Sequence, residues 1–245
     1  MKIIESILTK NPCYTAGRKI TVKGLMLHSV GCPQPKASVF VNSWNKSSFN
    51  SACVHGFIDA NDGIVYQTLP WNHRGWHGGG SSNNTHIGVE MCEPACIKYT
   101  GGSSFTCSDH ATAKAAVKRT YESAVELFAF LCKEYNLNPL GDGVIVSHKE
   151  GCARGIASNH GDPEHLWNGL SMGYTMDGFR KDVKAAMDAN NQKTLLTSAN
   201  DITWELNHTY FPILETEKFV KELDEAKQKN SSLYWGYYKL VNKIK

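Results

Sequence analysis

The chain has 245 residues, of which 41% are hydrophobic and 20% are charged, and its formal net charge at pH 7 is +3. This length fits one good-sized domain with a small appendage, and the composition is ordinary for a globular protein. The mild charge does not argue for nucleic-acid binding, and no apolar run reaches the roughly 18 residues that span a bilayer, so membrane insertion is not expected.

The N-terminal segment lacks the pattern of a secretory signal, because Glu5 and Lys10 interrupt what would be its apolar core. We therefore expect the chain to be made in the cytosol, where its eight cysteines are expected to be reduced thiols. Cys92 and Cys96 form a C-x3-C pair, but no second pair completes a structural zinc site.

Short apolar runs predict strands in the first half of the chain. Residues 25–27 end at His28 and a Gly-Cys-Pro loop, which indicates a buried strand that carries His28 at its end. Residues 39–44 favour a helix. Asn-Asp-Gly at 61–63 indicates a tight turn. Further strands are predicted at 54–58, 64–66 and 87–91.

Longer helical patterns begin after a Gly-, Ser- and Asn-rich loop at 74–84. From 108 to 135 apolar residues recur at intervals of three and four, which predicts a long amphipathic helix. The apolar residues 144–146 predict a strand that leads to His148. A long irregular loop is expected at 151–166, and a closing helix follows around 179–187.

Strands separated by helices predict an α/β fold with a central mixed β-sheet flanked by helices. The polar residues 190–200 favour a linker, so we predict one domain at 1–192 and a small C-terminal module at 193–245. That module is expected to contain a short amphipathic helix around 219–226 and ends in an aromatic cluster at 234–238, giving a small helical extension.

Two histidines and one aspartate are candidate metal ligands. Catalytic zinc takes three protein ligands and leaves a fourth position for water, and two His with one carboxylate are a common set. His28 and His148 each follow a short strand, where a rigid sheet aims both at one point, and Asp162 lies in the loop beyond. A lone histidine more often has a structural role than a metal-binding one, so the spacing alone does not decide between these two roles.

Glu90 is the next candidate because it lies at the end of an apolar strand. Packing explains a carboxylate poorly in that position, since burying its charge is costly. A strand-end salt bridge is the alternative explanation.

Four strings in this order carry a family resemblance: Leu27-His28-Ser29, Ile87-Gly88-Val89-Glu90, Ser147-His148-Lys149-Glu150 and Asp162-Pro163. Together they resemble the type-2 N-acetylmuramoyl-L-alanine amidases of the phage-lysozyme and peptidoglycan-recognition superfamily, over about residues 20–185. The resemblance implies Zn²⁺ held by His28, His148 and Asp162. Because members of the family use either Cys or Asp as the third ligand, Cys152 is a rival to Asp162.

The resemblance also implies roles for nearby residues. Glu90 takes the place of the general base, and His160 stands where many members have a lysine that stabilises the oxyanion. Trp76, His77 and Asn84 are candidate substrate-binding residues. His55 resembles a residue that packs near the site, and Val54 replaces a tyrosine that some members carry.

The implied reaction is hydrolysis of the amide between N-acetylmuramic acid and L-alanine in bacterial peptidoglycan. A non-catalytic peptidoglycan-recognition protein is one alternative, although such members usually lose a zinc ligand. A zinc peptidase that cuts within the stem peptide is the other, although the chain lacks H-E-x-x-H.

The resemblance and the lack of a signal together favour a phage or prophage endolysin, released to the wall through a holin-type pore. An enzyme that recycles wall fragments inside the cell is the alternative. The C-terminal module is expected to bind cell wall through its aromatic cluster, to mediate homo-oligomerisation, or to form a small cap on the amidase domain.

Overall fold

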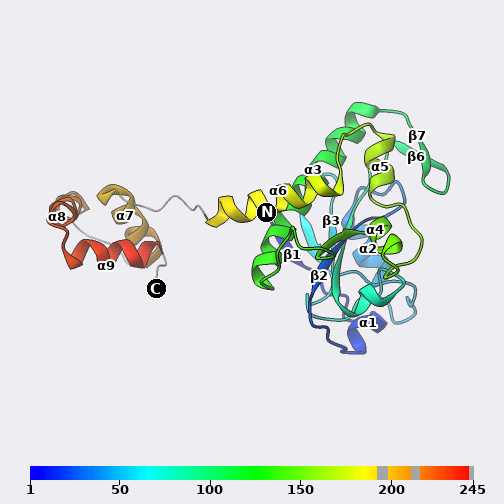
Figure 1. The fold of residues 1–245 in the computed structure, drawn as a ribbon, viewed down its shortest axis with the longest axis horizontal. Helices are drawn as coiled ribbons and strands as arrows, with labels where there is room; N and C mark the ends of the chain where they lie inside the picture. Colours follow the sequence, from blue (N-terminus) through cyan, green and yellow to red (C-terminus); the bar gives the residue numbers. More distant parts are fainter. Residues whose placement is uncertain (192–197, 211–215, 243–245) are drawn as a thin grey trace. The chain divides into compact units, whose positions relative to one another are not determined.

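The structure is a computed structural model that describes residues 1–191, 198–210 and 216–242. The chain folds into two compact units, an N-terminal unit of Met1–Asp188 and a C-terminal unit of Ala189–Lys245 (Figure 1). Residues 192–197 lie outside the described part, so the predicted boundary at 192 stays a prediction.

A six-stranded sheet forms the centre of the N-terminal unit, with the strand order β1-β4-β3-β5-β2-β8. All neighbouring strands run parallel except β3 and β4, which are antiparallel, so the predicted central mixed sheet is confirmed. The strands are β1 (Ile3–Glu5), β2 (Gly24–Ser29), β3 (Gly56–Ile58), β4 (Val65–Gln67), β5 (His86–Met91) and β8 (Ile145–Ser147). Of these, β1 was not predicted from the sequence.

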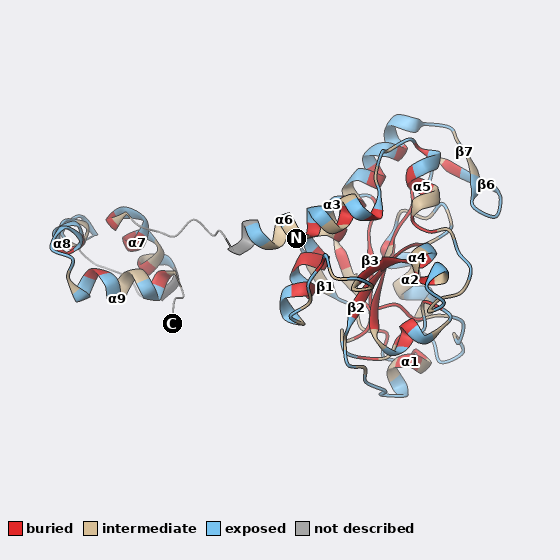
Figure 2. Cartoon of the chain, viewed as in Figure 1, coloured by how far each residue is buried: buried red, intermediate tan, exposed pale blue. Residues whose placement is uncertain are grey.

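The interior strand β2, between β5 and β8, is buried along its whole length, and its alternating side chains point to the two faces of the sheet (Figure 2). Leu25 and Leu27 belong to the main core, to which helices α3 (His110–Glu134) and α6 (Met176–Asn191) also contribute. Met26 and His28 point to the opposite face. On that face helix α2 (Ala37–Trp44) packs against β3 and β4.

Helix α3 begins where the sequence provides a cap. The side chain of Asp109 accepts a hydrogen bond from the backbone N–H of Thr112, which satisfies one of the free donors of the first turn. Helix α4 (His148–Ala153) begins with a capping box in which Ser147 and Glu150 bond each other's backbone.

The loop predicted at 151–166 is wrong at both ends. It includes the second half of α4 and the start of α5 (Glu164–Gly169). The loop predicted at 74–84 likewise ends in the short 3₁₀ helix η1 (Ser81–Asn84), and the N-terminal segment contains the one-turn helix α1 (Pro12–Thr15). Such short elements carry too little periodicity to be read from sequence.

A separate two-stranded hairpin, β6 (Ile97–Gly101) and β7 (Ser104–Cys107), was not predicted either. It lies between the end of β5 and the start of α3 in the chain. Its pairing is antiparallel and becomes irregular between Tyr99 and Gly101.

The C-terminal unit is helical throughout its described part. Helix α8 (Thr216–Gln228) covers the predicted amphipathic segment, while α7 (Ala199–Glu205), the π-helical turn η2 (Leu206–Tyr210) and α9 (Ser232–Val241) were not predicted. Its small core consists of Ala199, Ile202, Leu206, Leu223, Ala226, Tyr234 and Val241. The predicted linker at 190–200 overlaps the end of α6 at Asn191 and the start of α7 at Ala199, and its middle, 192–197, lies outside the described residues.

The aromatic cluster of α9 differs from the surface expected of it. Tyr234 is buried, and Tyr237 and Tyr238 pack partly against the same core, so most of the cluster is a helical core stripe. Trp235 remains exposed on this unit. None of the helices in the described segments is long and apolar enough to cross a membrane.

Candidate active site

The candidate metal ligands meet at one edge of the central sheet. His28 is the next-to-last residue of β2, and His148 directly follows the neighbouring parallel strand β8. Because the carboxyl ends of parallel strands share an edge, the two imidazoles meet there, and their Nδ1 atoms lie 3.0 Å apart. Asp162 reaches the same point from the loop before α5, with Oδ2 3.3 Å from His28 Nδ1 and Oδ1 3.6 Å from His148 Nδ1.

The proton on His28 is fixed by a chain of hydrogen bonds that ends on the backbone. His77 Nε2 lies 3.1 Å from the carbonyl oxygen of His86 and must donate to it. His77 Nδ1 is then an acceptor, so His28 Nε2 donates to it across 3.0 Å. Neutral His28 therefore presents an unprotonated Nδ1 to His148 and Asp162.

His148 is oriented in the same way. The hydroxyl of Ser158 lies 3.1 Å from His148 Nε2 and also contacts the carbonyl oxygen of Gly78 and His160 Nδ1. When His148 Nε2 donates to Ser158, Nδ1 of His148 is a free lone pair that points into the site. Ser158 was not identified from the sequence, and a single serine in a loop gives no sequence signal for this role.

The ring of His77 leaves no room for a side chain at Gly88, the residue of β5 that precedes Val89 and Glu90. A Cβ at this position would stand 2.3 Å from the ring of His77, so a side chain there would displace it. The backbone N–H of Gly88 donates to His55 Nδ1, and His55 Nε2 donates to the carbonyl of His73. His55 is therefore a buried residue of the layer behind the site, as the resemblance predicts.

The three donor atoms fit a zinc ion in spacing and in charge state. Donors about 2.0–2.1 Å from a tetrahedral zinc ion lie roughly 3.3 Å apart. The two Nδ1 atoms are 3.0 Å apart, Asp162 Oδ2 lies 3.3 Å from His28 Nδ1, and Asp162 Oδ1 lies 3.6 Å from His148 Nδ1, so each pair of residues offers donors near that spacing. Burial lowers the pKa of His148 to about 4. Burial would raise the pKa of Asp162, but His28 and His148 hold it below its ordinary value. Burial would lower the pKa of His28, but Asp162 and Glu90 raise it, so the cluster favours a positive charge among these groups, either as a proton or as a metal ion.

Glu90 lies at the end of β5, opposite His28 in the register of the two parallel strands. Its carboxyl group lines the cleft, and Oε2 is buried with no hydrogen-bond partner in the described structure. Burial raises the pKa of Glu90 to about 8, with His28 opposing the shift and Asp162 adding to it. This carboxyl group therefore holds a proton more tightly than an ordinary glutamate and has a free oxygen at the site.

The other predicted residues fall into two groups. His160 and Trp76 line the cleft, with the Trp76 side chain 50% exposed and the His160 ring 4.4 Å from that of His148. Asn84 is not among the described residues that line the cleft, and its side chain accepts a hydrogen bond from Arg74. Cys152 is on α4 outside the cluster of ligand atoms, with its thiol directed to Asn159.

His77 has a different place from the one expected of a substrate-binding residue. It lines the cleft, but both ring nitrogens are engaged, one by His28 and the other by a backbone carbonyl. Its main contact is therefore to the ligand His28. The neighbouring Asn83 holds the loop by accepting from the N–H groups of His77 and Gly78.

The cleft around the site has a volume of about 830 Å³. Its lining includes residues that the sequence did not point to, on the β6–β7 hairpin and on α5: Tyr99, Gly102, Ser103 and His165. The arrangement combines metal-type donors with a buried carboxyl group in an open cleft, which suits a hydrolase.

The profile of the N-acetylmuramoyl-L-alanine amidase family matches residues 17–165. Since this is more than half of the chain and contains the whole candidate ligand set, the chain belongs to that family. The predicted enzyme, an amidase that acts on peptidoglycan, is thereby confirmed. No curated protein matches the chain in sequence.

Solved structures share the fold at low sequence identity. The Staphylococcus aureus hydrolase AmiA, in complex with its ligand, is similar with a TM-score of 0.58 and 19% identity over 79% of this chain and 86% of that one. The catalytic domain of PlyG has a TM-score of 0.53 and 18% identity, over 76% and 96%. The catalytic domain of XlyA has a TM-score of 0.50 and 23% identity, over 75% and 99%.

Proposed function

We propose that this amidase is zinc-dependent and that His28, His148 and Asp162 hold the ion. The observation that carries the proposal is the pair of Nδ1 lone pairs, 3.0 Å apart, whose orientation is imposed from behind by His77 and Ser158. A metal-binding histidine usually donates its other ring nitrogen to a fixed partner in this way. Cys152 has no such geometry toward the two histidines.

We infer that the bond cut is the amide between the lactyl group of N-acetylmuramic acid and L-alanine. When bound, zinc polarises the carbonyl and lowers the pKa of water toward ~7. Glu90 then accepts the proton of the attacking water and passes it to the departing amine nitrogen. His160 donates a hydrogen bond to the carbonyl oxygen, where negative charge develops in the transition state.

The exposed indole of Trp76 is proposed to stack on a sugar ring of the glycan at one side of the cleft. His77 acts mainly through His28. We withdraw Asn84 as a substrate contact, because its side chain is directed to Arg74 rather than into the cleft.

We propose that the biological setting is lysis of the bacterial wall by a phage or prophage, with release through a holin-type pore. The support is the wall-degrading activity of the family, combined with a C-terminal unit that exposes Trp204 and Trp235. Recycling of wall fragments inside the cell is the alternative, and it gives these exposed indoles no role.

The test combines metal analysis with mass spectrometry of digested wall. Chelation is expected to abolish hydrolysis, and zinc is expected to restore it. The products should carry a new L-alanine N-terminus, whereas a peptidase would release other termini and a recognition protein none. Asp162→Ala should bind zinc poorly, while Cys152→Ser should still bind one ion. Full activity in metal-stripped protein would refute the zinc proposal, and the reverse pattern of zinc content would move the third ligand to Cys152.

A further inference from the structure

The β6–β7 hairpin forms part of the cleft wall but takes no part in the reaction proposed above. Tyr99 and the tip residues Gly102 and Ser103 line the cleft. The side chains of Tyr99 and Phe105 are partly buried against the main core. The residues on either side of each in its strand are exposed: Lys98, Thr100, Ser104 and Thr106. The hairpin therefore has one face held against the N-terminal unit.

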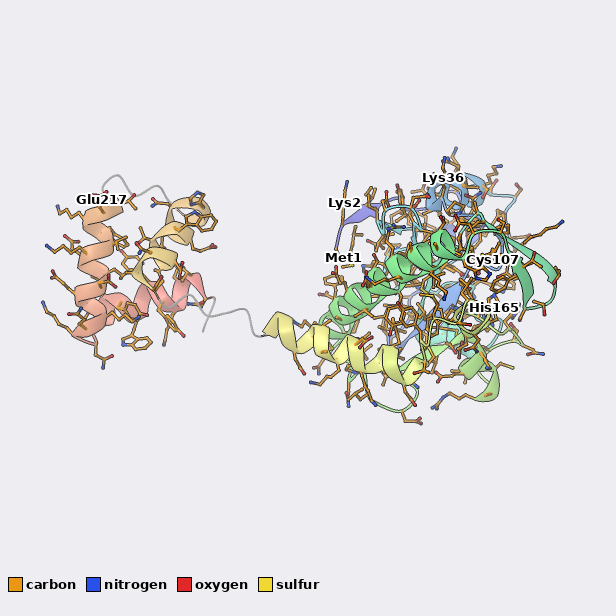
Figure 3. All side chains as sticks on the ribbon, turned by 90° about the horizontal axis from the view of Figure 1, so that it is seen from above. Met1, Lys2, Lys36, Cys107, His165 and Glu217 are labelled. Atoms are coloured by element: carbon orange, nitrogen blue, oxygen red, sulfur yellow. The ribbon has the colours of Figure 1, made fainter. Side chains whose placement is uncertain are left out.

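The hydroxyl of Tyr99 is the central polar contact of that face. It donates to Glu93 Oε2 across 2.8 Å and lies 2.6 Å from His165 Nε2. Glu93 is fully buried, and its other oxygen accepts from the backbone N–H of Gly31, in the loop after β2. Tyr99 thus joins the hairpin to two segments that border the site (Figure 3 labels His165 and, on the hairpin, Cys107).

The direction of these hydrogen bonds follows from the number of protons available. Tyr99 has one proton and gives it to Glu93, so it must accept from His165 Nε2. Nδ1 of His165 is buried and has no partner among the described residues, which fits a nitrogen without a proton. This direction holds for ionised Glu93, whose pKa burial raises to about 7.

The hairpin also packs directly on the segment that contains Asp162. A Cβ on Gly161 would stand 2.8 Å from Ser103 Oγ, and a Cβ on Gly169 would stand 2.5 Å from the ring of Phe105. The backbone N–H of His165 donates to the carbonyl of Gly161 across 3.1 Å. The hairpin therefore supports the segment 161–169 at both ends and, through His165, in its middle.

We propose that Tyr99 is a positioning residue, which acts through His165 and Gly161 to fix the loop that presents His160 and Asp162 to the cleft. The inference rests on the proposed function, since it concerns the ligand and the oxyanion donor named there. The carboxylate of Asp162 reaches the backbone N–H of Ser29 and both ligand histidines within 3.6 Å, so a small displacement of its loop changes every one of these contacts.

Tyr99→Phe removes the hydroxyl and leaves the ring, and the chain offers a matched control. Tyr121 is a second buried tyrosine whose hydroxyl donates to a carboxylate, that of Asp182, across 2.7 Å. This bond joins α3 to α6 and does not border the cleft. Tyr121→Phe therefore reports the general cost of losing a buried Tyr–carboxylate hydrogen bond.

The measurements are zinc affinity by competition with a chromophoric chelator, kcat and KM on a soluble muropeptide, and thermal unfolding. Both variants are expected to lose thermal stability. Only Tyr99→Phe is expected to bind zinc more weakly, by roughly tenfold, because changes to groups that orient metal ligands typically cost 10–100-fold. Its kcat should fall while its KM changes little.

A second pair of variants tests the route through His165. His165→Gln keeps an N–H donor for Tyr99 and should stay near wild type, whereas His165→Leu should match Tyr99→Phe. Unchanged zinc affinity and kcat in Tyr99→Phe, with a wild type that binds zinc, would overturn this inference alone. Equal zinc loss in Tyr121→Phe would also overturn it, by showing a purely structural effect. A wild type that binds no zinc would overturn the proposed function and this inference together.

Discussion

Each candidate ligand histidine is oriented by a hydrogen-bond partner at its Nε2 atom. His28 is oriented through His77 by the carbonyl oxygen of His86, and His148 through Ser158 by the carbonyl oxygen of Gly78. A backbone carbonyl can only accept, so His77 Nε2 donates to His86 and neutral His77 accepts from His28. The Ser158 hydroxyl contacts His148, His160 and the carbonyl of Gly78, and its one proton can be directed to any acceptor among them. In both histidines it is Nδ1 that faces the site.

At the same scale, Glu90→Gln is expected to keep zinc and fold but to lose turnover by roughly 10²-fold or more, because glutamine cannot accept the proton. Zinc content, circular dichroism and kcat on a soluble muropeptide check this. Glu122→Gln, which removes only an exposed carboxylate paired with Lys118, is the control. Near-normal turnover in Glu90→Gln would show that the carboxyl group of Glu90 is structural.

The sequence revealed those site residues that stand in recognisable strings. His28 and His148 follow apolar strands, Glu90 ends another strand, and Asp162 precedes a proline. Tyr99 and His165 are 66 residues apart in the chain, and Glu93 becomes buried only when the hairpin folds over it. Contacts of that kind depend on tertiary packing, so no local pattern could predict them.

At the scale of elements, the site depends on which strands are neighbours. β2 pairs with β5 on one side and with β8 on the other, so Glu90, His28 and His148 lie in adjacent strand ends. The apolar runs predicted these strands but not their order. Of the C-terminal helices, α9 was missed because its aromatic residues were interpreted as a binding surface, whereas their spacing of three and four residues is that of a core stripe.

The burial of His55 leads to a prediction about how the free energy of unfolding depends on pH. His55 is fully buried, and burial lowers its pKa to about 4, against an ordinary 6.5. Because the unfolded chain binds this proton more tightly, His55 stabilises the fold above pH 6.5, and that stabilisation is lost as the pH falls toward 4. The loss should approach about 3 kcal/mol.

Urea unfolding at pH 7.5 and pH 5, in the presence of a chelator, measures this effect. The drop in the free energy of unfolding should be smaller in His55→Gln than in the wild type, because glutamine does not titrate. Other buried histidines contribute to the remaining drop, as burial also lowers the pKa of His86. An identical drop in both proteins would contradict the assignment to His55.

At the scale of the whole molecule, all the proposed chemistry lies in the N-terminal unit, while the C-terminal unit has its own small core. A protein of residues 1–192 is expected to cleave soluble muropeptides at near full rate but to attack intact walls more slowly. A second wall-binding site raises the effective concentration of enzyme at a surface and adds nothing on a soluble fragment.

Exposure identifies the residues to test in the full-length chain. Trp204 and Trp235 are 59% and 43% exposed, whereas Tyr234 is 2% exposed and belongs to the core. Replacing both tryptophans with alanine should reproduce the slower attack on walls. If the shortened protein is unfolded, the C-terminal unit is a structural cap. If it digests walls as fast as the full chain, oligomerisation is the better explanation, and sedimentation of both proteins would show it.

The ligand set has one more consequence, which concerns the topology of the chain. His28 and His148 are 120 residues apart, and an ion held by both would join the interior strand β2 to the residue after the edge strand β8 and to the loop of Asp162. Such an ion would be a reversible cross-link of the folded chain, and its binding free energy would add to the free energy of folding. All eight cysteines are free thiols, so such an ion would be the only cross-link of this kind among the described residues. Chelation would then remove a structural link between the strands that shape the cleft, in addition to removing the catalytic ion.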